Sequence, residues 1–497
     1  MTGGEAPAIR TRGPKVQAWL AALEPRLLIR NEWVPPASGD TFDSIDPTTE
    51  ERLAVIASGQ ADDVDAAVRA ARGAFEEGPW PTFSPSDRAR LLRRFADLID
   101  AELDDLAELE TLDGGILLPV AKGLIAGAVD ALHHFAGAAA LVSGETVPSD
   151  PTYFNYTLRE PLGVCAAIIP WNAPVDTAVK KLAPALAAGN TCVLKPAEQT
   201  SVSALRLGEL ALEAGFPAGV LNIVTGFGST AGAALVDHRD VDKIGFTGST
   251  AVGKRILAAS AATLKRVTLE LGGKSPNIVF RDADLAQAVP AAMRGYSALS
   301  GQVCCAGTRI FVQQDIKDEF VDALVHCSNE ITVGDPLDGA TTMGPVVSEQ
   351  QFQRVRSYMD IGVAEGAVAR TGGAVLDRPG YFLQPTVFDD VRGDMRIARE
   401  EIFGPVVSVI PFSDEHDAVL QANDTDYGLA AAVWTSDVSR AHTVARRVKA
   451  GTVWINNIMK TSVTMPFGGY KQSGIGREGG PHWYEQYTQE KAVYLKY

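Results

Sequence analysis

Two adjacent cysteines, Cys304 and Cys305 in the segment SGQVCCAG, are the strongest candidates for a nucleophile in this chain. A thiolate attacks carbonyl carbons, and a neighbouring base can generate it from the thiol. Cysteines are also common as small buried apolar side chains, and composition alone favours that interpretation. The chemistry of the pair therefore depends on which groups the fold brings beside it.

Two further residues would complete a site for thiol-dependent acyl transfer. Glu270 lies near the end of a predicted strand, RVTLEL, and Asn172 lies in PWNAP, directly after another. A nucleophile, a carboxylate base and an amide donor for an oxyanion are the parts that such a site needs.

Three loops are candidates for binding phosphate or ribose. GFGSTAG at 226–232 places its third glycine one residue late for the GxGxxG pattern, so it is weak on its own. In FTGSTAVG, Gly248 and Ser249 open a helix whose free N–H groups could meet a pyrophosphate. In KPAEQT, Glu198 beside Lys195 could accept bonds from ribose hydroxyls, although an exposed capping box explains the same glutamate.

The elements that must position these loops alternate regularly between strand and helix. The predicted strands are 162–170, 191–196, 220–226, 242–248 and 266–271, and the predicted helices between them are 175–187, 201–214, 229–237 and 249–260. This alternation predicts a doubly wound parallel sheet with helices on both faces. Ligands bind such sheets at the carboxyl ends of the strands, where the candidate loops lie.

The sequence predicts the structure of the flanking regions in less detail. Residues 1–25 show no sustained period and are expected to be a loosely attached extension, followed by short strands within 27–36 and 40–58. One long helix is expected from a cap at Ser84 to the double glycine at 114 and 115. A second αβ region follows up to about 473. The segments 153–161 and 487–497 alternate like edge strands and suggest pairing with another subunit.

Bulk composition excludes several classes of protein. The 497 residues are enough for two or three domains, and 46% hydrophobic with 21% charged residues is typical of a folded globular chain. A net charge of −16 without a Lys/Arg-rich run argues against nucleic acid and anionic membranes as partners. Five cysteines without CxxC spacing predict neither a disulfide scaffold nor a metal site. No apolar stretch approaching about 20 residues and no secretory h-region is found, so a cytoplasmic location is expected.

Seven segments occur together in one order: PWNAP, VLKPAEQT, GFTGSTAVGK, VTLELGGKSPNIV, GQVCCAG, EEIFGPV and PFGGYKQSGIGRE. From about residue 27 to its end the chain resembles the NAD(P)-dependent aldehyde dehydrogenase superfamily. The resemblance implies an aldehyde dehydrogenase-like α/β fold that assembles as a homodimer or homotetramer. Its expected parts are an NAD-binding domain (26–145 and 162–273) with a doubly wound parallel sheet, an αβ catalytic domain (274–473) and a small β oligomerisation arm (146–161 and 474–497), after the extension 1–25.

The resemblance also implies roles for the catalytic candidates. The cysteine that follows GQ and one further residue is the family's nucleophile, here Cys304, while Cys305 holds a variable position. Asn172 and the Cys304 backbone N–H would form the oxyanion hole, and Glu270 would be the general base. Relatives that pass the acyl group to coenzyme A typically lack this glutamate, so hydrolysis to the free acid is expected. Adjacent side chains point in different directions, so only one thiol can face the cleft.

For the cofactor the resemblance implies NAD rather than NADP, because Glu198 would repel a 2′-phosphate. The expected cofactor-binding residues are Ile168, Pro170, Trp171, Lys195, Glu198, Gly228, Phe246, Gly248, Ser249, Val252, Leu271, Gln351, Glu401 and Phe403.

The aldehyde itself is not indicated by these motifs. Positions that line the entrance in relatives correspond to Ala173, Asp176, Val179, Lys180, Ala298, Val303, Met459, Lys460 and Phe467. Few are aromatic, which argues against a cage for a quaternary ammonium. Lys180 or Lys460 could anchor the carboxylate of a semialdehyde, or each could point into solvent. Three hypotheses remain: a hydrolytic dehydrogenase of broad or unidentified specificity, a dedicated semialdehyde dehydrogenase, and a non-catalytic structural relative, against which the intact catalytic residues argue.

Overall fold

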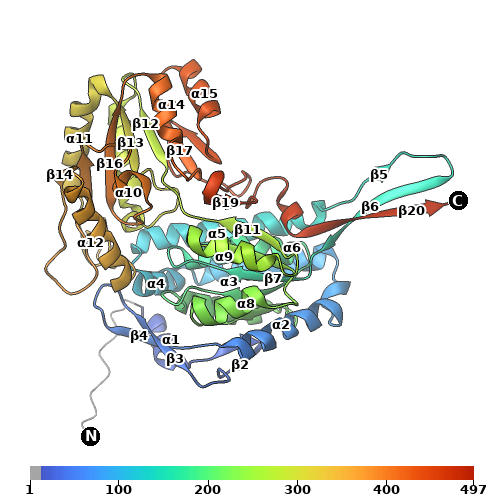
Figure 1. Ribbon diagram of the computed structural model, residues 1–497. Helices are drawn as coiled ribbons and strands as arrows, with labels where there is room; N and C mark the ends of the chain where they lie inside the picture. The colour runs from blue at the N-terminus through green and yellow to red at the C-terminus, as the bar shows by residue number, and fades with distance from the viewer. Residues whose placement is uncertain (1–12) are drawn as a thin grey trace, which may run out of the picture.

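The computed structural model describes residues 13–497 (Figure 1). Residues 1–12 of the expected extension therefore lie outside the described part. Within it, Pro14–Ala22 forms helix α1, with Val16 and Leu20 buried. The prediction of a loosely attached segment is thus wrong for these residues, because α1 packs against α4 (Leu103–Gly114).

The larger sheet has eight strands and carries the loops identified from the sequence. In spatial order these are β19 (Gly474–Ile475), β11 (Arg266–Glu270), β10 (Lys243–Thr247), β7 (Val164–Ile168), β8 (Thr191–Lys195), β9 (Leu221–Ile223), β1 (Leu27–Ile29) and β2 (Glu32–Val34). The five strands from β7 to β11 are parallel, as predicted. The chain runs outward from β7 to β9 and returns to β10 on the other side of β7. The point where strand order reverses, between β7 and β10, is where such sheets bind ligands.

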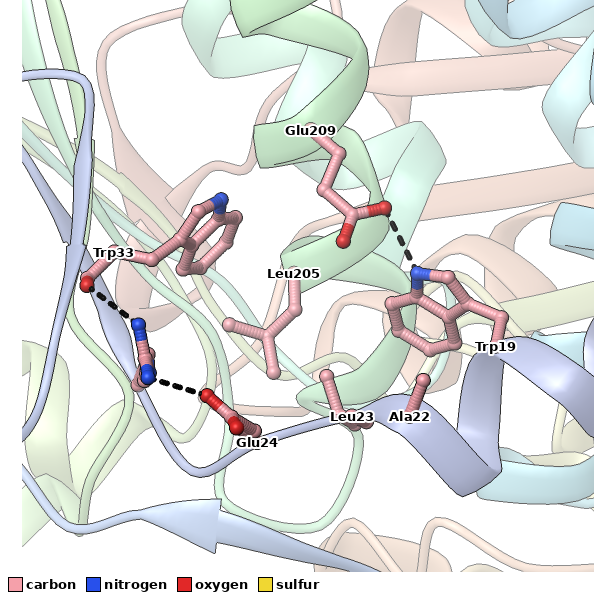
Figure 2. Close-up of a pocket in the computed structure, with 8 residues that line it drawn as sticks. Trp19, Ala22, Leu23, Glu24, Trp33, Leu205 and Glu209 are labelled. Atoms are coloured by element: carbon pink, nitrogen blue, oxygen red, sulfur yellow. Dashed lines mark hydrogen bonds and ion pairs between the residues drawn. The ribbon is translucent and has the colours of Figure 1, made fainter.

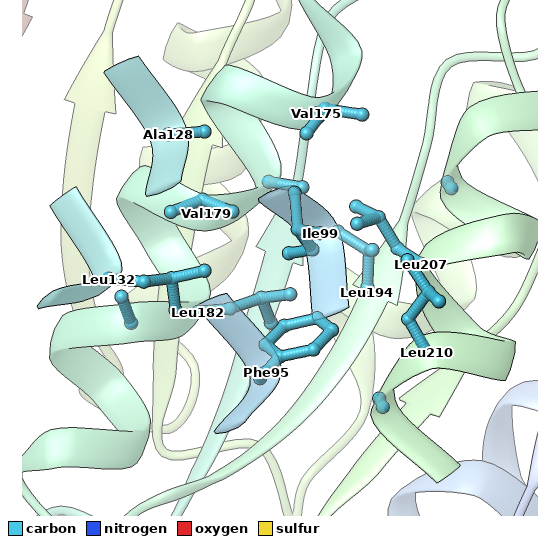
Figure 3. Packing of buried hydrophobic residues seen from close by; sticks show 14 of the residues in the cluster. Phe95, Ile99, Ala128, Leu132, Val175, Val179, Leu182, Leu194, Leu207 and Leu210 are labelled. Atoms are coloured by element: carbon cyan, nitrogen blue, oxygen red, sulfur yellow. The ribbon is translucent and has the colours of Figure 1, made fainter. Parts of the chain in front are cut away.

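Helices cover both faces of this sheet because both faces of its central strands are apolar. On β7, Val164 and Ala166 face one hydrophobic cluster, and Cys165 and Ala167 face the other. One face carries α2 (Ala61–Glu76), α8 (Ala233–Asp237) and α9 (Thr250–Ser260), and the other carries α3 (Pro85–Ala101), α4, α5 (Leu118–Ala138), α6 (Pro174–Ala187) and α7 (Val202–Ala214). Figure 3 shows the second face, where Phe95 of α3, Leu182 of α6 and Leu194 of β8 pack together.

The single long helix expected after Ser84 is two helices in the structure. Ser84 and Pro85 begin α3 as predicted, but α3 ends at Ala101 and Glu102 leaves the helical region before α4 begins. The break turns α4 into the interior, where every residue from Leu106 to Gly114 is buried. No glycine or proline marks this break in the sequence.

Helix α5 contradicts the expectation that the chain has no long apolar stretch. With its short continuation, Leu118–Leu141 is long and apolar enough to cross a membrane by length and composition, so the sequence does contain such a stretch. Half of its most apolar window is buried within the protein, and Ile125, Leu132 and Phe135 belong to the large hydrophobic cluster. These contacts are those of a core helix.

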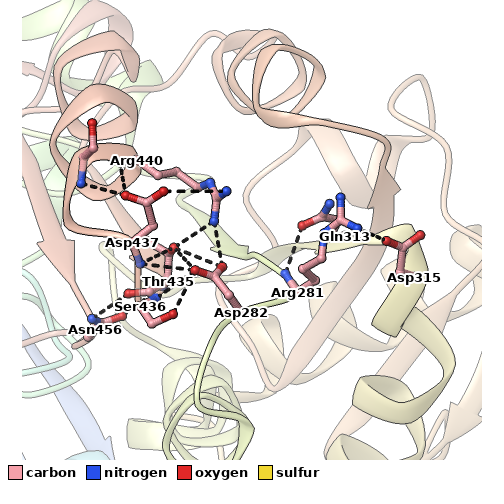
Figure 4. Close-up of polar contacts among 10 residues, drawn as sticks. Arg281, Asp282, Gln313, Asp315, Thr435, Ser436, Asp437, Arg440 and Asn456 are labelled. Atoms are coloured by element: carbon pink, nitrogen blue, oxygen red, sulfur yellow. Dashed lines mark hydrogen bonds and ion pairs between the residues drawn. The ribbon is translucent and has the colours of Figure 1, made fainter.

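The second sheet is also mainly parallel and lies above the first in Figure 1. Its strands are β14 (Val368–Thr371), β15 (Thr386–Asp389), β16 (Val406–Phe412), β13 (Arg309–Gln313), β12 (Pro276–Val279), β17 (Ala430–Trp434) and β18 (Thr452–Ile455), and its helices are α10 (Leu285–Ser297), α11 (Lys317–Asn329), α12 (Glu349–Ala364), α13 (Arg396–Arg399), α14 (Glu415–Asn423) and α15 (Val438–Arg447). Asp282, which follows β12, accepts hydrogen bonds from Thr435 after β17 and from Arg440 of α15 (Figure 4). This carboxylate ties the ends of two strands together at one edge of the sheet.

A third sheet projects from the body of the molecule as an arm (Figure 1). It contains β5 (Thr146–Val147), β6 (Tyr153–Pro161) and β20 (Thr488–Lys496), and β6 pairs with β20 along its whole length. The two expected edge strands thus pair with each other, while Gly474–Ile475, expected in the arm, pairs with β11 in the large sheet. A separate hairpin joins β3 (Thr41–Ile45) to β4 (Arg52–Ala57). The division into named domains stays a prediction.

Candidate active site

The catalytic candidates meet where the two larger sheets join. Asn172 lies in the loop after β7, and Glu270 is the last residue of β11. Cys304 lies in the loop between α10 and β13 of the second sheet. The Asn172 side chain donates from Nδ2 to the Gln302 carbonyl oxygen at 2.8 Å, so it contacts the cysteine loop directly.

Local backbone geometry shapes the cysteine loop. Leu299 and Ser300 adopt φ values of 48° and 56°, and Gly301 follows with φ 75°. A Cβ on Gly301 would lie 2.1 Å from the Gly404 carbonyl oxygen, so only glycine fits there. Gln302 then fixes the loop, because its Oε1 accepts from the Val347 N–H at 2.9 Å.

The double glycine after β11 allows the two sheets to approach closely. A Cβ on Gly273 would lie 2.3 Å from the Cys304 carbonyl oxygen, and one on Gly272 would lie 2.2 Å from Glu401 Oε2. The Gly273 N–H donates to Glu401 Oε1 at 3.0 Å. The segment ELGG therefore brings the cysteine loop and Glu401 to the end of the strand that carries Glu270.

The two cysteines differ in their surroundings. Cys305 is buried in a hydrophobic cluster of the second sheet, whereas Cys304 is partly exposed at its margin. A hydrogen bond with the Cys305 thiol, together with burial, raises the pKa of Cys304 well above its usual range. The negative charges of Glu401 and Glu270 act in the same direction. Cys304 therefore needs a proton acceptor before it can attack.

Glu270 has the properties of such an acceptor. Its side chain is buried, and neither carboxylate oxygen has a hydrogen-bond partner within residues 13–497. Burial raises the pKa of Glu270 well above its ordinary value, and the charge of Glu478 raises it further. The positive charges of Lys181 and Arg477 oppose this shift.

Lys181, which is buried, and Glu478, which is partly exposed, form an ion pair beside Glu270, with Lys181 Nζ 2.6 Å from Glu478 Oε1. Sequence reasoning missed both residues. Glu478 is the last residue of the motif PFGGYKQSGIGRE, which could have drawn attention to it. Nothing in the sequence indicated that Glu478 would contact a lysine of α6.

The expected adenosine-side residues lie at the ends of β8 and β9. Lys195 is buried and donates to Glu198 Oε2 at 3.3 Å. Burial lowers the pKa of Lys195, and the charge of Glu198 opposes that effect. Gly228 opens a π-helical turn, Gly228–Gly232, and a Cβ there would meet open space. A Cβ on Gly232 would lie 3.9 Å from the Lys195 side chain, so the two loops are neighbours.

The expected pyrophosphate-side residues lie at the end of β10. Ser249 caps α9 by accepting from the Val252 N–H at 3.4 Å, and Gly248 donates its N–H to the Glu270 carbonyl at 3.0 Å. The side chains of Ile168, Phe246 and Leu271 are buried in the cluster on this face, with Val252 packed against it. Pro170 and Trp171 are partly exposed in the loop after β7.

Glu401 and Phe403 reach the same junction from the second sheet. The Phe403 ring packs edge-on against Trp171, with ring centroids 5.1 Å apart. Burial raises the pKa of Glu401 to about 7, although the hydrogen bond that its carboxylate accepts from the Gly273 N–H lowers the pKa. Gln351 donates from Nε2 to the Phe403 carbonyl at 2.7 Å, so its amide contacts the backbone of this loop. Arg354, which the sequence did not suggest, donates to the Glu401 carbonyl at 2.5 Å.

A small cavity of about 90 Å³ lies beside the Lys181–Glu478 pair. Its lining residues are Phe135, Lys180, Thr461, Ser462, Val463, Met465, Phe467, Glu478 and Gly479. Two expected entrance residues, Lys180 and Phe467, are among them. Ala173 and Asp176 lie at the start of α6, and Val303 and Met459 pack against the cluster that holds Cys305.

The two candidate anchoring lysines differ from each other in their surroundings. Lys180 does not point freely into solvent, because its Nζ lies 2.6 Å from Asp176 Oδ2. Burial lowers the pKa of Lys180, but this ion pair outweighs burial and holds it above its ordinary value. Lys460 is exposed and is not among the residues that line the cavity. Val179 was expected at the entrance, but it is fully buried in the core (Figure 3).

A larger cavity, of about 220 Å³, lies between α1, β2 and α7. Figure 2 shows Trp19, Trp33 and Leu205 around it, with Trp19 donating to Glu209. None of the catalytic candidates lines it, so it is separate from the junction described above.

Comparison with known proteins shows that the chain belongs to the aldehyde dehydrogenase family, whose model matches residues 33–493. An aldehyde dehydrogenase of Emericella nidulans is 50% identical, over 95% of each chain. Aldehyde dehydrogenase 1A1 of Gallus gallus is 49% identical, over 95% of this chain and 93% of its own. The solved NAD+ complex of an aldehyde dehydrogenase from Bacillus cereus is 47% identical, with a TM-score of 0.96 over 98% of this chain and 99% of that chain. The predicted fold and the predicted class of aldehyde-oxidising enzyme are confirmed.

Proposed function

We propose that the protein oxidises an aldehyde to the carboxylic acid, with NAD+ as hydride acceptor and water as the second reactant. The observation that carries this proposal is the meeting of Asn172, Glu270 and the Cys304 loop at one junction between the sheets. The NAD+ complex of the Bacillus cereus relative supports the choice of cofactor.

The residues at the strand ends fit this cofactor. Lys195 and Glu198 would hold the adenosine ribose, and the free N–H groups at the start of α9, capped by Ser249, would meet the pyrophosphate. Glu401 would accept a bond from the nicotinamide ribose. When bound, the nicotinamide accepts the hydride that leaves the substrate carbon. A carboxylate at Glu198 would repel a 2′-phosphate, which favours NAD+ over NADP+.

The three catalytic residues then act in sequence. Glu270, directly or through water, takes the thiol proton, and the Cys304 sulfur bonds to the aldehyde carbon. The resulting oxyanion accepts hydrogen bonds from the Asn172 amide and the Cys304 N–H. Loss of hydride from this adduct leaves a thioester on Cys304. Glu270 releases this first proton to solvent and then takes a proton from water, whose oxygen attacks the thioester carbon. The carbon–sulfur bond breaks, and the departing sulfur takes the proton back from Glu270, which frees the acid and the thiol.

The electrostatics of the cavity favour an aldehyde without a carboxylate. Lys180 is the lining residue best suited to bind a carboxylate, and Asp176 already neutralises it. A semialdehyde would have to compete with that ion pair. The alternative, a dedicated semialdehyde dehydrogenase, is therefore less well supported.

A panel of aldehydes assayed by NADH formation tests the proposal. We expect activity with uncharged aldehydes and a higher kcat/KM for butyraldehyde than for succinic semialdehyde. A clear preference for the semialdehyde would establish the alternative instead. If no aldehyde gave NADH, the proposed function would be wrong, and the hypothesis of a non-catalytic structural relative would be favoured.

Assembly as a homodimer or homotetramer is proposed on the basis of the arm. Its strands expose apolar side chains, including Tyr494, Leu495 and Phe154, and β20 lies at the outer edge of its sheet. Apolar surface on a projecting sheet favours a partner subunit. Sedimentation of the purified protein tests this, and a monomer would contradict it. The cytoplasmic location stays a prediction.

A further inference from the structure

Two buried carboxyl groups on α4, Glu110 and Asp113, lie outside the active site, and each residue is only 1% exposed. Burying a carboxyl group without partners is costly, so its contacts indicate what it does for the fold. Both side chains reach the first turn of a helix that follows an active-site loop.

Glu110 contacts the start of α6. Its Oε1 accepts from the Val175 N–H at 2.7 Å, and Val175 is the second residue of that helix. The N-cap residue, Ala173, makes no side-chain capping bond. Glu110 therefore provides, from another helix, the acceptor that a capping side chain normally supplies. Asn172 immediately precedes the N-cap, so its placement depends on how α6 begins.

Asp113 makes the equivalent contact with α7. Its Oδ2 accepts from the Val202 N–H at 3.0 Å, and Val202 is the first residue of α7. Its other oxygen accepts from the Ser44 hydroxyl. Ser201, at the N-cap, donates its own hydroxyl to the Ala197 carbonyl and makes no capping bond. Glu198 lies in this loop, between β8 and α7.

We propose that Glu110 and Asp113 are positioning residues, each of which fixes one loop of the active site. Glu110 fixes the loop that carries Asn172, and Asp113 fixes the loop that carries Glu198. The inference rests on the proposed function, from which it takes the roles of Asn172 in the oxyanion hole and of Glu198 at the ribose. One short helix, buried from Leu106 to Gly114, thereby holds a catalytic loop and a cofactor loop in fixed positions.

The protonation of Glu110 fits this role. Burial raises the pKa of Glu110 to about 8, and the charges of Asp176 and Asp113 act in the same direction. At neutral pH the group is therefore mostly a neutral acid, which has the shape of a glutamine side chain. Its Oε2 has no hydrogen-bond partner within the described chain, and besides Val175 the Ser203 hydroxyl interacts with the group and lowers its pKa, so glutamine would keep the bond to Val175.

Four variants separate positioning from general stability. Glu110→Ala should lower kcat about 10- to 100-fold with KM for NAD+ nearly unchanged, because misplacing an oxyanion donor affects the chemical step. Asp113→Ala should raise KM and the dissociation constant for NAD+ about tenfold with kcat nearly unchanged, since it acts on the ribose loop. Glu110→Gln should restore kcat. Asp104→Ala is the matched control, because Asp104 is an exposed carboxylate on the same helix.

Hydrogen–deuterium exchange gives a readout that does not depend on activity. Glu110→Ala should speed exchange within residues 169–177, and Asp113→Ala within 196–204, each leaving the other loop protected. If the wild type formed no NADH with any aldehyde, the proposed function would fail, while exchange and NAD+ titration would still test the two loops. The inference is overturned if both alanine variants alter kcat and KM alike, or if exchange rises in both loops together. Should the alanine variants not fold, Glu110→Gln and Asp113→Asn replace them, and only the second should weaken NAD+ binding.

Discussion

Asn172 donates its Nδ2 hydrogen to the Gln302 carbonyl oxygen at 2.8 Å, and this bond joins loops that belong to different sheets. Asn172 follows β7, and Gln302 lies two residues before Cys304. The amide is thus held beside the nucleophile's loop by the protein alone. A donor placed in advance needs no reorganisation when charge develops on the substrate.

Asn172→Ala should therefore lower kcat by about 10²- to 10³-fold, the usual cost of removing one oxyanion-hole donor. Binding of NAD+ should be unaffected, because the change removes no cofactor contact proposed above. Initial rates of NADH formation and a fluorescence titration with NAD+ measure the two effects. Asn155→Ala, which removes an amide on the arm, is the control. Equal kcat values for Asn172→Ala and the wild type would exclude Asn172 from the oxyanion hole.

The two cysteines give a matched pair of substitutions. Cys304→Ser should abolish aldehyde oxidation, because a serine hydroxyl is a far weaker nucleophile in a site built for a thiol. Cys305→Ser should keep most of the activity, at a cost of about 1–2 kcal/mol in stability from burying a hydroxyl. Steady-state rates and thermal midpoints of both variants check this. The reverse pattern would make Cys305 the nucleophile.

The pH profile should respond to the ion pair beside Glu270. The base must be ionised, so activity should fall as the pH drops through the raised pKa of Glu270. Glu478→Gln removes a negative charge and leaves Lys181 unpaired, and both effects lower that pKa. Its acid limb in kcat should therefore move to lower pH. Lys181→Met should move the acid limb to higher pH, because it removes a positive charge near Glu270. If the acid limbs of both variants shifted in the same direction, the ion pair would not act on Glu270.

The elements of the large sheet could be predicted from sequence because their signals are local. Apolar runs ending in glycine or proline define its strands, and the residues proposed for the adenosine and pyrophosphate sides lie at the ends of these strands or directly after them. The break at Glu102 could not be predicted, since only the packing of α4 reveals it. The pairing of Lys181 with Glu478 joins residues 297 positions apart, and no local pattern reports such a contact. The same holds for Glu110 and Asp113, which sequence reasoning placed on a long helix without a role.

Glu198 should determine the choice between the two nicotinamide cofactors. Glu198→Ser removes the charge that would face a 2′-phosphate and leaves Lys195 without its partner. Like charges brought together cost several kcal/mol, so removing one should raise kcat/KM for NADP+ by about tenfold or more. Rates with both cofactors for the wild type and Glu198→Ser measure the change. A wild type that prefers NADP+ would contradict the assignment of Glu198 to the adenosine ribose.

Glu110 should also affect the pH dependence of stability. Its pKa is about 8 in the folded protein and near 4.5 when exposed, so between these values the folded state holds a proton that the unfolded chain has lost. The free energy of unfolding therefore falls as the pH rises through this window, by up to about 1.4 kcal/mol per pH unit from this group, and then becomes constant. Glu110→Gln cannot titrate, so its stability relative to the wild type should increase from about pH 5 to about pH 8. Denaturant unfolding across this range, with Asp104→Asn as the control, measures the difference. Parallel pH profiles for Glu110→Gln and the wild type would show that Glu110 is ionised in the folded protein, and the Val175 N–H would then donate to a carboxylate.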